Sequence, residues 1–67
     1  MRVYAVLSWG DLDLGNMTAI PQAGDTVQIP DGVFIVRKRL FQYEGRLNWY
    51  GQIRRTWACR LFFEDNP

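Results

Sequence analysis

The chain has 67 residues, of which 48% are hydrophobic and 22% are charged, and its formal net charge is +1. This length suits a single β-barrel domain over residues 1–67 with one hydrophobic core, and the composition excludes an intrinsically disordered chain. Because a core of this size supplies only a few kcal/mol of net stability, we expect self-association to help hold the fold together.

The chain has one cysteine and no histidine, which limits the cellular compartments and the site chemistry that we expect of it. The single cysteine, Cys59, has no partner for an intramolecular disulfide, and the chain has no histidine with which to build a zinc site. The apolar run near the N-terminus is too short for a signal peptide, and no apolar stretch approaches the roughly 20 residues of a membrane helix. We therefore expect a soluble, cytoplasmic protein without a membrane partner.

The first third of the chain contains one clear strand pattern. Residues 2–9 are rich in β-branched and aromatic residues with alternating polarity, which predicts a first strand. Residues 10–16 combine glycine, aspartate and asparagine and predict a loop. Residues 17–20 predict a short strand, which Pro21 ends because proline cannot donate to a sheet ladder.

The middle of the chain predicts a hairpin with one long arm. Residues 21–25 predict a turn, and residues 26–29 predict a strand that is buried on one face. The next residues, Pro30-Asp31-Gly32, predict a tight turn, because proline presets its own φ and glycine accepts a positive φ. The second arm, residues 33–43, is long enough to cross the domain and to bend on the way.

The last third of the chain predicts two more strands. Glu44 and Gly45 predict a turn, residues 46–50 a short strand, and Gly51 a break. Residues 52–64 predict a final strand. Alternation along that strand places one set of side chains on a common core face and leaves Phe62 on the other, exposed face. The set predicted for the core is Trp57, Cys59, Leu61 and Phe63.

No apolar pattern with a period of 3.6 residues lasts long enough for a helix of substance. Without a helix to cover a flat sheet, five or six short strands bury their apolar faces by curling together. The sequence therefore predicts an all-β fold, namely a small five- to six-stranded antiparallel barrel or roll of the Src-homology-3-like kind.

The layout of residues 20–27, followed by Pro30-Asp31-Gly32, Val36 and Arg37, resembles one that recurs in small uncharacterised β-barrel proteins of bacteria, phages and mobile gene cassettes. It consists of a turn, a strand, a tight hairpin and a long strand that ends in basic residues. These elements are structural, so the resemblance implies a fold and not an activity. The cassette-borne type II dihydrofolate reductases are also small barrels of this kind, but their active-site motif is absent here.

The chain contains few side chains that are suited to catalysis. Without histidine, the chain lacks the commonest general base and metal ligand, and its carboxylates fall mainly in predicted turns. Asp11, Asp13 and Asn16 are spaced as in a calcium loop, but the glutamate that closes such a loop is missing. The sequence predicts no enzyme, catalytic residue, cofactor or metal site. An enzyme built around a symmetric pore from several copies is the remaining catalytic alternative.

Charge is unevenly distributed along the chain. Residues 37–60 carry seven basic residues and one acidic residue, a balance of +6, whereas residues 1–36 carry one basic and four acidic residues, a balance of −3. Aromatic residues interleave the basic segment. Arginine with exposed aromatics is typical of surfaces that bind single-stranded nucleic acid and of protein interfaces.

Three interpretations of this basic and aromatic half remain open: a solvated outer face, a homo-oligomer interface, and a site for single-stranded nucleic acid or an acidic protein surface. In the nucleic-acid case the arginines would contact phosphates and the aromatics would stack on bases. In the oligomer case Phe62 would be the exposed anchor. The candidate interaction residues are Arg37, Arg39, Tyr43, Arg46, Trp49, Tyr50, Arg54, Arg55 and Phe62.

Overall fold

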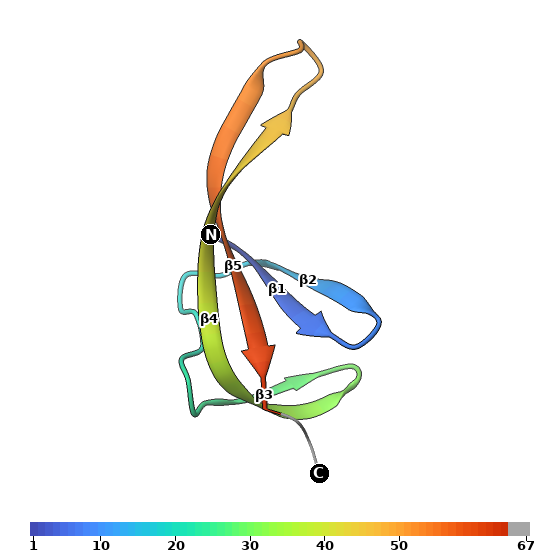
Figure 1. Ribbon diagram of the computed structural model, residues 1–67, viewed down its shortest axis with the longest axis vertical. Helices are drawn as coiled ribbons and strands as arrows, with labels where there is room; N and C mark the ends of the chain where they lie inside the picture. The colour runs from blue at the N-terminus through green and yellow to red at the C-terminus, as the bar shows by residue number, and fades with distance from the viewer. Residues whose placement is uncertain (65–67) are drawn as a thin grey trace.

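The structure is a computed structural model that describes residues 1–64. These residues form five strands and no helix, and the strands make one sheet in the order β2-β1-β5-β4-β3. The sheet curls into a half-barrel, so the predicted all-β fold is confirmed (Figure 1). The strands are β1 (Arg2–Leu7), β2 (Gly10–Asn16), β3 (Thr26–Ile29), β4 (Gly32–Leu47) and β5 (Ile53–Phe63).

The sheet is mixed, so the prediction of a purely antiparallel barrel is wrong. Strand β1 runs parallel to β5, with Val3 beside Cys59 and Ala5 beside Leu61, while the other three pairings are antiparallel. Tight turns fix the direction of strands that are adjacent in sequence. No turn joins β1 to β5, which lie far apart along the chain, and their direction follows from how the two halves of the chain pack.

The residues predicted as a loop form β2 instead. The hairpin from β1 turns at Ser8 and Trp9, and a bulge then shifts the register between Val3 and Tyr4. At this bulge the carboxylate of Asp13 accepts the backbone N–H of Gly15 at 2.7 Å, and Gly15 has φ +81°. The turn-forming residue types therefore serve a bulge within a strand. Residues 17–20, predicted as a strand, lie outside the sheet.

The turn at residues 21–25 and the strand at residues 26–29 are confirmed. The carboxylate of Asp25 accepts the backbone N–H of Gln22 at 2.8 Å, and the backbone of Gly24 and Asp25 bonds Val36 of β4 on both sides. The reversal before Gly32 is also confirmed, because Ile29 pairs with Gly32 across the β3–β4 hairpin. These bonds hold β3 as the edge strand next to the first residues of β4.

Strand β4 continues through the predicted turn at Glu44 and Gly45. Gly45 pairs with Arg55 in an unbroken ladder, and a Cβ atom added to Gly45 would lie 3.0 Å from the Cγ2 atom of Ile53. This glycine thus makes room for the side chain of Ile53 and does not reverse the chain. A separate bulge at Arg37 bends β4 near its start.

The reversal between β4 and β5 occurs at residues 48–52, so the predicted strand at residues 46–50 is wrong from Asn48 onward, and Arg46 and Leu47 are the last residues of β4. The side-chain oxygen of Asn48 accepts the backbone N–H groups of Tyr50 at 3.0 Å and Gln52 at 2.9 Å. The backbone N–H of Asn48 donates to the carbonyl of Gln52 at 2.8 Å. Gly51 completes the turn with φ +75°, a value that favours glycine.

The core is small and lies inside the curl of the sheet. Its fully buried cluster consists of Val3, Val36, Cys59 and Leu61. The predicted burial of Cys59 and Leu61 is confirmed, and burial raises the pKa of the Cys59 thiol. The predicted burial of Trp57 is wrong, because this side chain is 52% exposed. Phe63 is half-buried, with its ring centroid 5.3 Å from that of Phe34.

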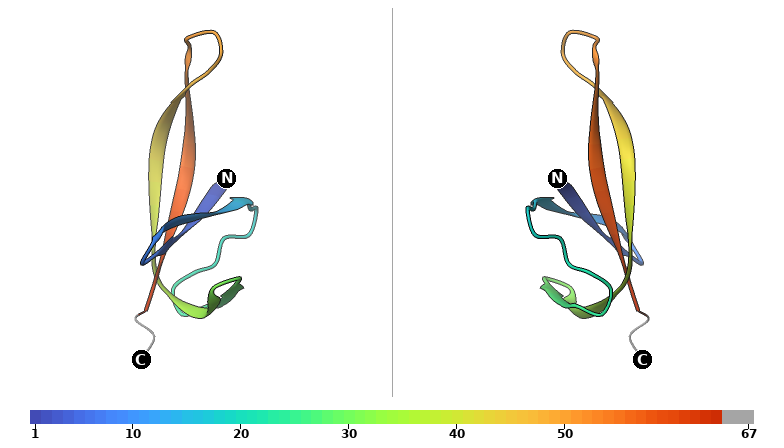
Figure 2. Two further views of the ribbon diagram at one scale, coloured as in Figure 1. Left: turned by 90° about the vertical axis from the view of Figure 1, so that its right-hand side faces the viewer. Right: turned by 90° about the vertical axis from the view of Figure 1, so that its left-hand side faces the viewer.

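A hydrogen bond between two side chains joins the β1–β2 hairpin to the β3–β4 hairpin. The indole nitrogen of Trp9, in the β1–β2 turn, donates to the carboxylate of Asp31 in the β3–β4 turn at 2.8 Å. At the opposite end, β4 and β5 project well beyond the other strands (Figures 1 and 2). The molecule is therefore elongated, with extents of 46 × 22 × 15 Å.

Candidate interaction surface

The projecting part of β4 and β5 forms a two-stranded arm, defined here as residues 43–57. Strand β1 meets β5 first at Ala58, opposite Arg2, so residues 53–57 of β5 have β4 as their only neighbour among the described strands. Figure 1 shows the arm at the top, away from β1 and β2. A two-stranded hairpin that packs against nothing is marginally stable in water.

One face of the arm continues the core face of the sheet. Residues directly opposite in an antiparallel pair share a face, and Phe41 lies opposite Cys59, a core residue. The next pairs on that face are Tyr43 with Trp57, Gly45 with Arg55, and Leu47 with Ile53, so Arg55 is the charged residue among them. The rings of Tyr43 and Trp57 touch, with centroids 5.1 Å apart. We call these five residues the apolar stripe: Phe41, Tyr43, Leu47, Ile53 and Trp57.

The apolar stripe is open to solvent. Leu47 is 73% exposed, Ile53 64% and Tyr43 56%. An aromatic side chain has about 150–250 Å² of surface to bury, so the stripe exposes several hundred Å² of mainly apolar surface. Monomeric soluble proteins rarely expose a contiguous apolar patch of more than a few hundred Å². The stripe thus has the size and composition of an interface.

The tip of the arm presents two further aromatic side chains. Trp49 is 100% exposed and Tyr50 is 87% exposed. The hydrogen bonds of Asn48 fix the backbone of the turn that carries them. Rigid aromatic side chains on an ordered turn are well suited to contact a partner, because little conformational entropy is lost on binding.

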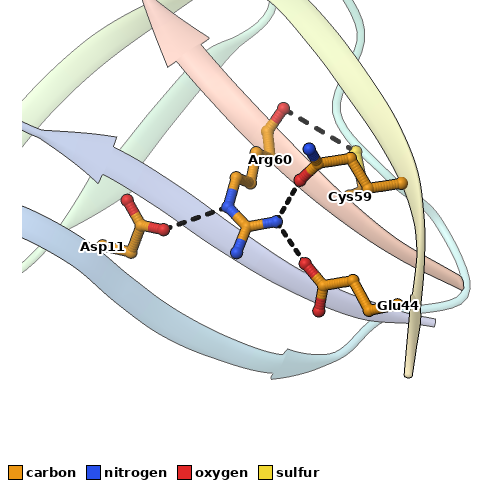
Figure 3. Close-up of polar contacts among 5 residues, drawn as sticks. Asp11, Glu44, Cys59 and Arg60 are labelled. Atoms are coloured by element: carbon orange, nitrogen blue, oxygen red, sulfur yellow. Dashed lines mark hydrogen bonds and ion pairs between the residues drawn. The ribbon is translucent and has the colours of Figure 1, made fainter. Parts of the chain in front are cut away.

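The opposite face of the sheet carries an ionic network centred on Arg60 (Figure 3). Its guanidinium donates to Asp11 of β2 at 3.0 Å and to Glu44 of β4 at 2.5 Å, and it also bonds the side-chain oxygen of Gln42. The bond to Glu44, followed by that to Asp11, raises the pKa of Arg60 above its usual value. Since the network ties β2, β4 and β5 together across β1, we assign it a structural role.

The arm gathers six of the nine predicted interaction residues. Tyr43 lies on the apolar stripe, Trp49 and Tyr50 lie at the tip, and Arg54 and Arg55 are exposed on β5. Arg46 pairs with Arg54 in the ladder, and its side chain lies outside the described part of the structure.

The other three predicted residues lie nearer the half-barrel. Arg37 is exposed at the bulge of β4, and the guanidinium of Arg39 lies 5.2 Å from the ring centroid of Phe41. Phe62 is half-buried on the face opposite the apolar stripe, with the ammonium of Lys38 at 5.0 Å from its ring centroid. Phe62 thus lies away from the arm and is covered in part.

Sequence reasoning missed the rest of the apolar stripe. The predicted break at Gly51 placed Leu47 and Ile53 in two separate strands, and Trp57 was placed in the core. The signal was nevertheless present, because Tyr43, Gly45 and Leu47 continue the period of two that runs through β4.

A groove lies beside the arm where β1 begins and β2 ends. It has a volume of about 690 Å³, and its lining includes Arg54, Arg55 and Thr56 of β5 together with Met1, Arg2 and Asn16. Arg2 is bound to Asp13 at 2.9 Å. Within residues 1–64, neither Arg54 nor Arg55 has a carboxylate at ion-pair distance. The groove therefore carries positive charge that the described part of the chain leaves unneutralised.

Two further findings concern membranes and metals. None of the described residues belongs to a helix that could cross a membrane. Over the same residues, no three cysteine, aspartate or glutamate side chains lie close enough together to hold a metal ion. Comparison of the chain with protein-family models, with curated proteins and with solved structures found no match.

Proposed function

We propose that this protein is a non-enzymatic interaction module that self-associates through the apolar stripe of its arm. The observation that carries the proposal is that the core face continues along β4 and β5 past the first residue of β1. The side chains that follow Cys59 and Phe41 along this face have no covering layer among the described residues. Burial of such a face is the main favourable term in protein association.

The surface area of the chain supports this proposal. Its accessible surface is 5155 Å², which exceeds the roughly 4400 Å² expected for a compact monomer of 7.9 kDa by several hundred Å². A standard interface takes about 800 Å² from each partner. The excess is therefore of the order that one copy would bury against a second.

Charge favours a particular arrangement of the two copies. Arms that lay side by side would bring the arginines of both copies together. The segment before β4 is acidic, with a balance of −3 over residues 1–36. We expect each arm to lie against this acidic part of the other copy across a twofold axis, with arginines at the rim of the apolar contact. The arm of the other copy would bring each half-barrel closer to the Src-homology-3-like barrel that the sequence predicts. We further propose that the protein is cytoplasmic.

Light scattering after size-exclusion chromatography tests the proposal. We expect a particle mass that is a multiple of 7.9 kDa and that changes little between low and high salt, because apolar burial is not screened. A monomer at every protein concentration would contradict self-association.

A second candidate function is the binding of single-stranded nucleic acid. The fully exposed Trp49 favours it, as do Arg54 and Arg55, which form no ion pair with any described carboxylate, since stacking platforms and cationic side chains are the elements of such sites. The same chromatography separates the two functions through the ratio of absorbance at 260 and 280 nm. An excess at 260 nm that disappears at high salt would favour nucleic acid, because phosphate contacts are strongly salt-dependent.

A further inference from the structure

The edge of β5 within the arm is open to another strand. From Ala58 to Phe62 this edge is occupied by β1, which runs parallel to it. From Ile53 to Trp57 no described strand lies there, although the ladder to β4 on the other side is complete (Figure 1). A new strand could therefore continue the position of β1 along the arm.

The hydrogen-bond pattern of the arm identifies the free backbone groups. The N–H of Asn48 donates to the carbonyl of Gln52, which marks these residues as a hydrogen-bonded pair. Hydrogen-bonded and non-hydrogen-bonded pairs alternate along an antiparallel ladder, and the register from Leu47 and Ile53 onward is unbroken. The N–H and C=O groups of Ile53 and Arg55 thus point away from β4, toward the open edge. Such a row of groups is a template for strand addition.

The open edge borders the cationic groove described above. Arg54 and Arg55 of the edge strand line the groove together with Met1, whose α-amino group donates to the carbonyl of Met17 at 3.3 Å. The one carboxylate that lines the groove is Glu44, which Arg60 already binds at 2.5 Å. An occupant with negative charge would complement this surface.

We propose that the open edge of β5 binds an extended acidic peptide segment of another protein as an added strand. Alternation defines the pattern that the segment needs. On one face its side chains would meet Arg54 and Thr56, where carboxylates fit. On the other face they would meet Ile53 and Trp57, where apolar side chains fit, with Arg55 between these two residues. The ligand is therefore a segment that alternates acidic and apolar residues. The added strand would pair with the edge of the arm, whereas self-association would bury its face, and Ile53 and Trp57 would contribute to both contacts.

Binding of the labelled hexapeptide Glu-Val-Glu-Val-Glu-Val, followed by fluorescence anisotropy, tests the proposal. The matched peptides are Gln-Val-Gln-Val-Gln-Val, which lacks charge, and Glu-Glu-Glu-Val-Val-Val, which lacks alternation. We expect the alternating acidic peptide to bind most tightly and to weaken as salt is added. Equal binding of all three peptides, or no binding of the first, would overturn the proposal.

Variants of Arg54 and Arg55 separate charge from strand addition. We expect Arg54→Ala to weaken binding about fivefold through the loss of a charge-assisted contact. Arg55→Ala and Arg55→Pro remove the same charge, but only the proline variant also removes the edge N–H, and that group does not serve the ladder to β4. The proline variant should bind about 2- to 10-fold more weakly than the alanine variant. Equal binding by the two variants would contradict strand addition.

Two controls make the result of the peptide titration independent of whether the protein self-associates or binds nucleic acid. The titrations are made at a dilution where light scattering reports a monomer, so failure of self-association leaves the peptide test intact. A single-stranded oligothymidylate serves as a competitor. If it displaces the peptide and binds more tightly, the groove is a nucleic-acid site and the peptide proposal falls.

Discussion

Replacing Ile53 and Trp57 together with serine should raise the dissociation constant of the assembly by about 30-fold or more. Both side chains lie on the apolar stripe and are more than half exposed in the single chain. Their removal therefore costs the half-barrel little, while the assembly loses its central contacts. Aromatic side chains at the centre of an interface typically contribute about 2 kcal/mol or more. Sedimentation equilibrium over a range of concentrations measures the effect.

Leu40→Ser is the matched control for this experiment. Leu40 lies opposite Arg60, hence on the face that carries the ionic network, and it is 41% exposed. Its replacement removes exposed apolar surface from the neighbouring strand β4 without touching the apolar stripe, so the dissociation constant should stay the same. If the control weakens the assembly as much as the double variant does, the interface lies on the other face of the sheet.

Replacing Leu61 with alanine should destabilise the domain by about 2–5 kcal/mol, because the change leaves a cavity among Val3, Val36 and Cys59. A domain of this length has a free energy of unfolding of about 3–10 kcal/mol. The variant should therefore lose a large part of its stability, and the urea midpoint followed by circular dichroism should fall steeply.

Leu47→Ala is the corresponding control for Leu61→Ala. Leu47 has the same chemistry and lies on the arm, where it is largely exposed. At a dilution that keeps the protein monomeric, its loss should change the free energy of unfolding by less than about 0.5 kcal/mol. The assignment of the core to the inside of the half-barrel would fail if the two variants had similar midpoints.

Local chemistry made several elements predictable from the sequence. The strand at residues 26–29 and the reversal before Gly32 depend on alternation and on the dihedral preferences of proline and glycine, which act over a few residues. The burial of Cys59 and Leu61 follows from the same alternation. These features need no knowledge of how distant segments meet.

The sequence-based predictions were wrong where the role of a glycine, or the position at which a strand begins or ends, depends on tertiary structure. Gly45 resembles a turn residue in sequence, but it lies inside a strand because Ile53 passes close to it. Trp57 shares the face of Cys59 and Leu61 and yet is exposed, because β1 begins to pair with β5 only at Ala58, one residue after Trp57. The parallel pairing of β1 with β5 joins the two ends of the chain, and no local signal specifies it.

These same errors explain why the candidate site was predicted only in part. The arginine and aromatic content of residues 37–60 identified the correct half of the chain. The distinction between the two faces of the arm required the register, which joins Tyr43 to Trp57 and Leu47 to Ile53. A shift of one residue in register would have moved every one of these side chains to the other face.

Hydrogen exchange of the arm amides at two protein concentrations tests the central claim most directly. An uncovered two-stranded arm opens readily, whereas a partner that covers the apolar stripe stabilises the closed ladder. We predict that the amides of residues 43–57 exchange much more slowly at high concentration than after dilution. Exchange that is fast in the arm and independent of concentration would contradict the claim that this face is an interface.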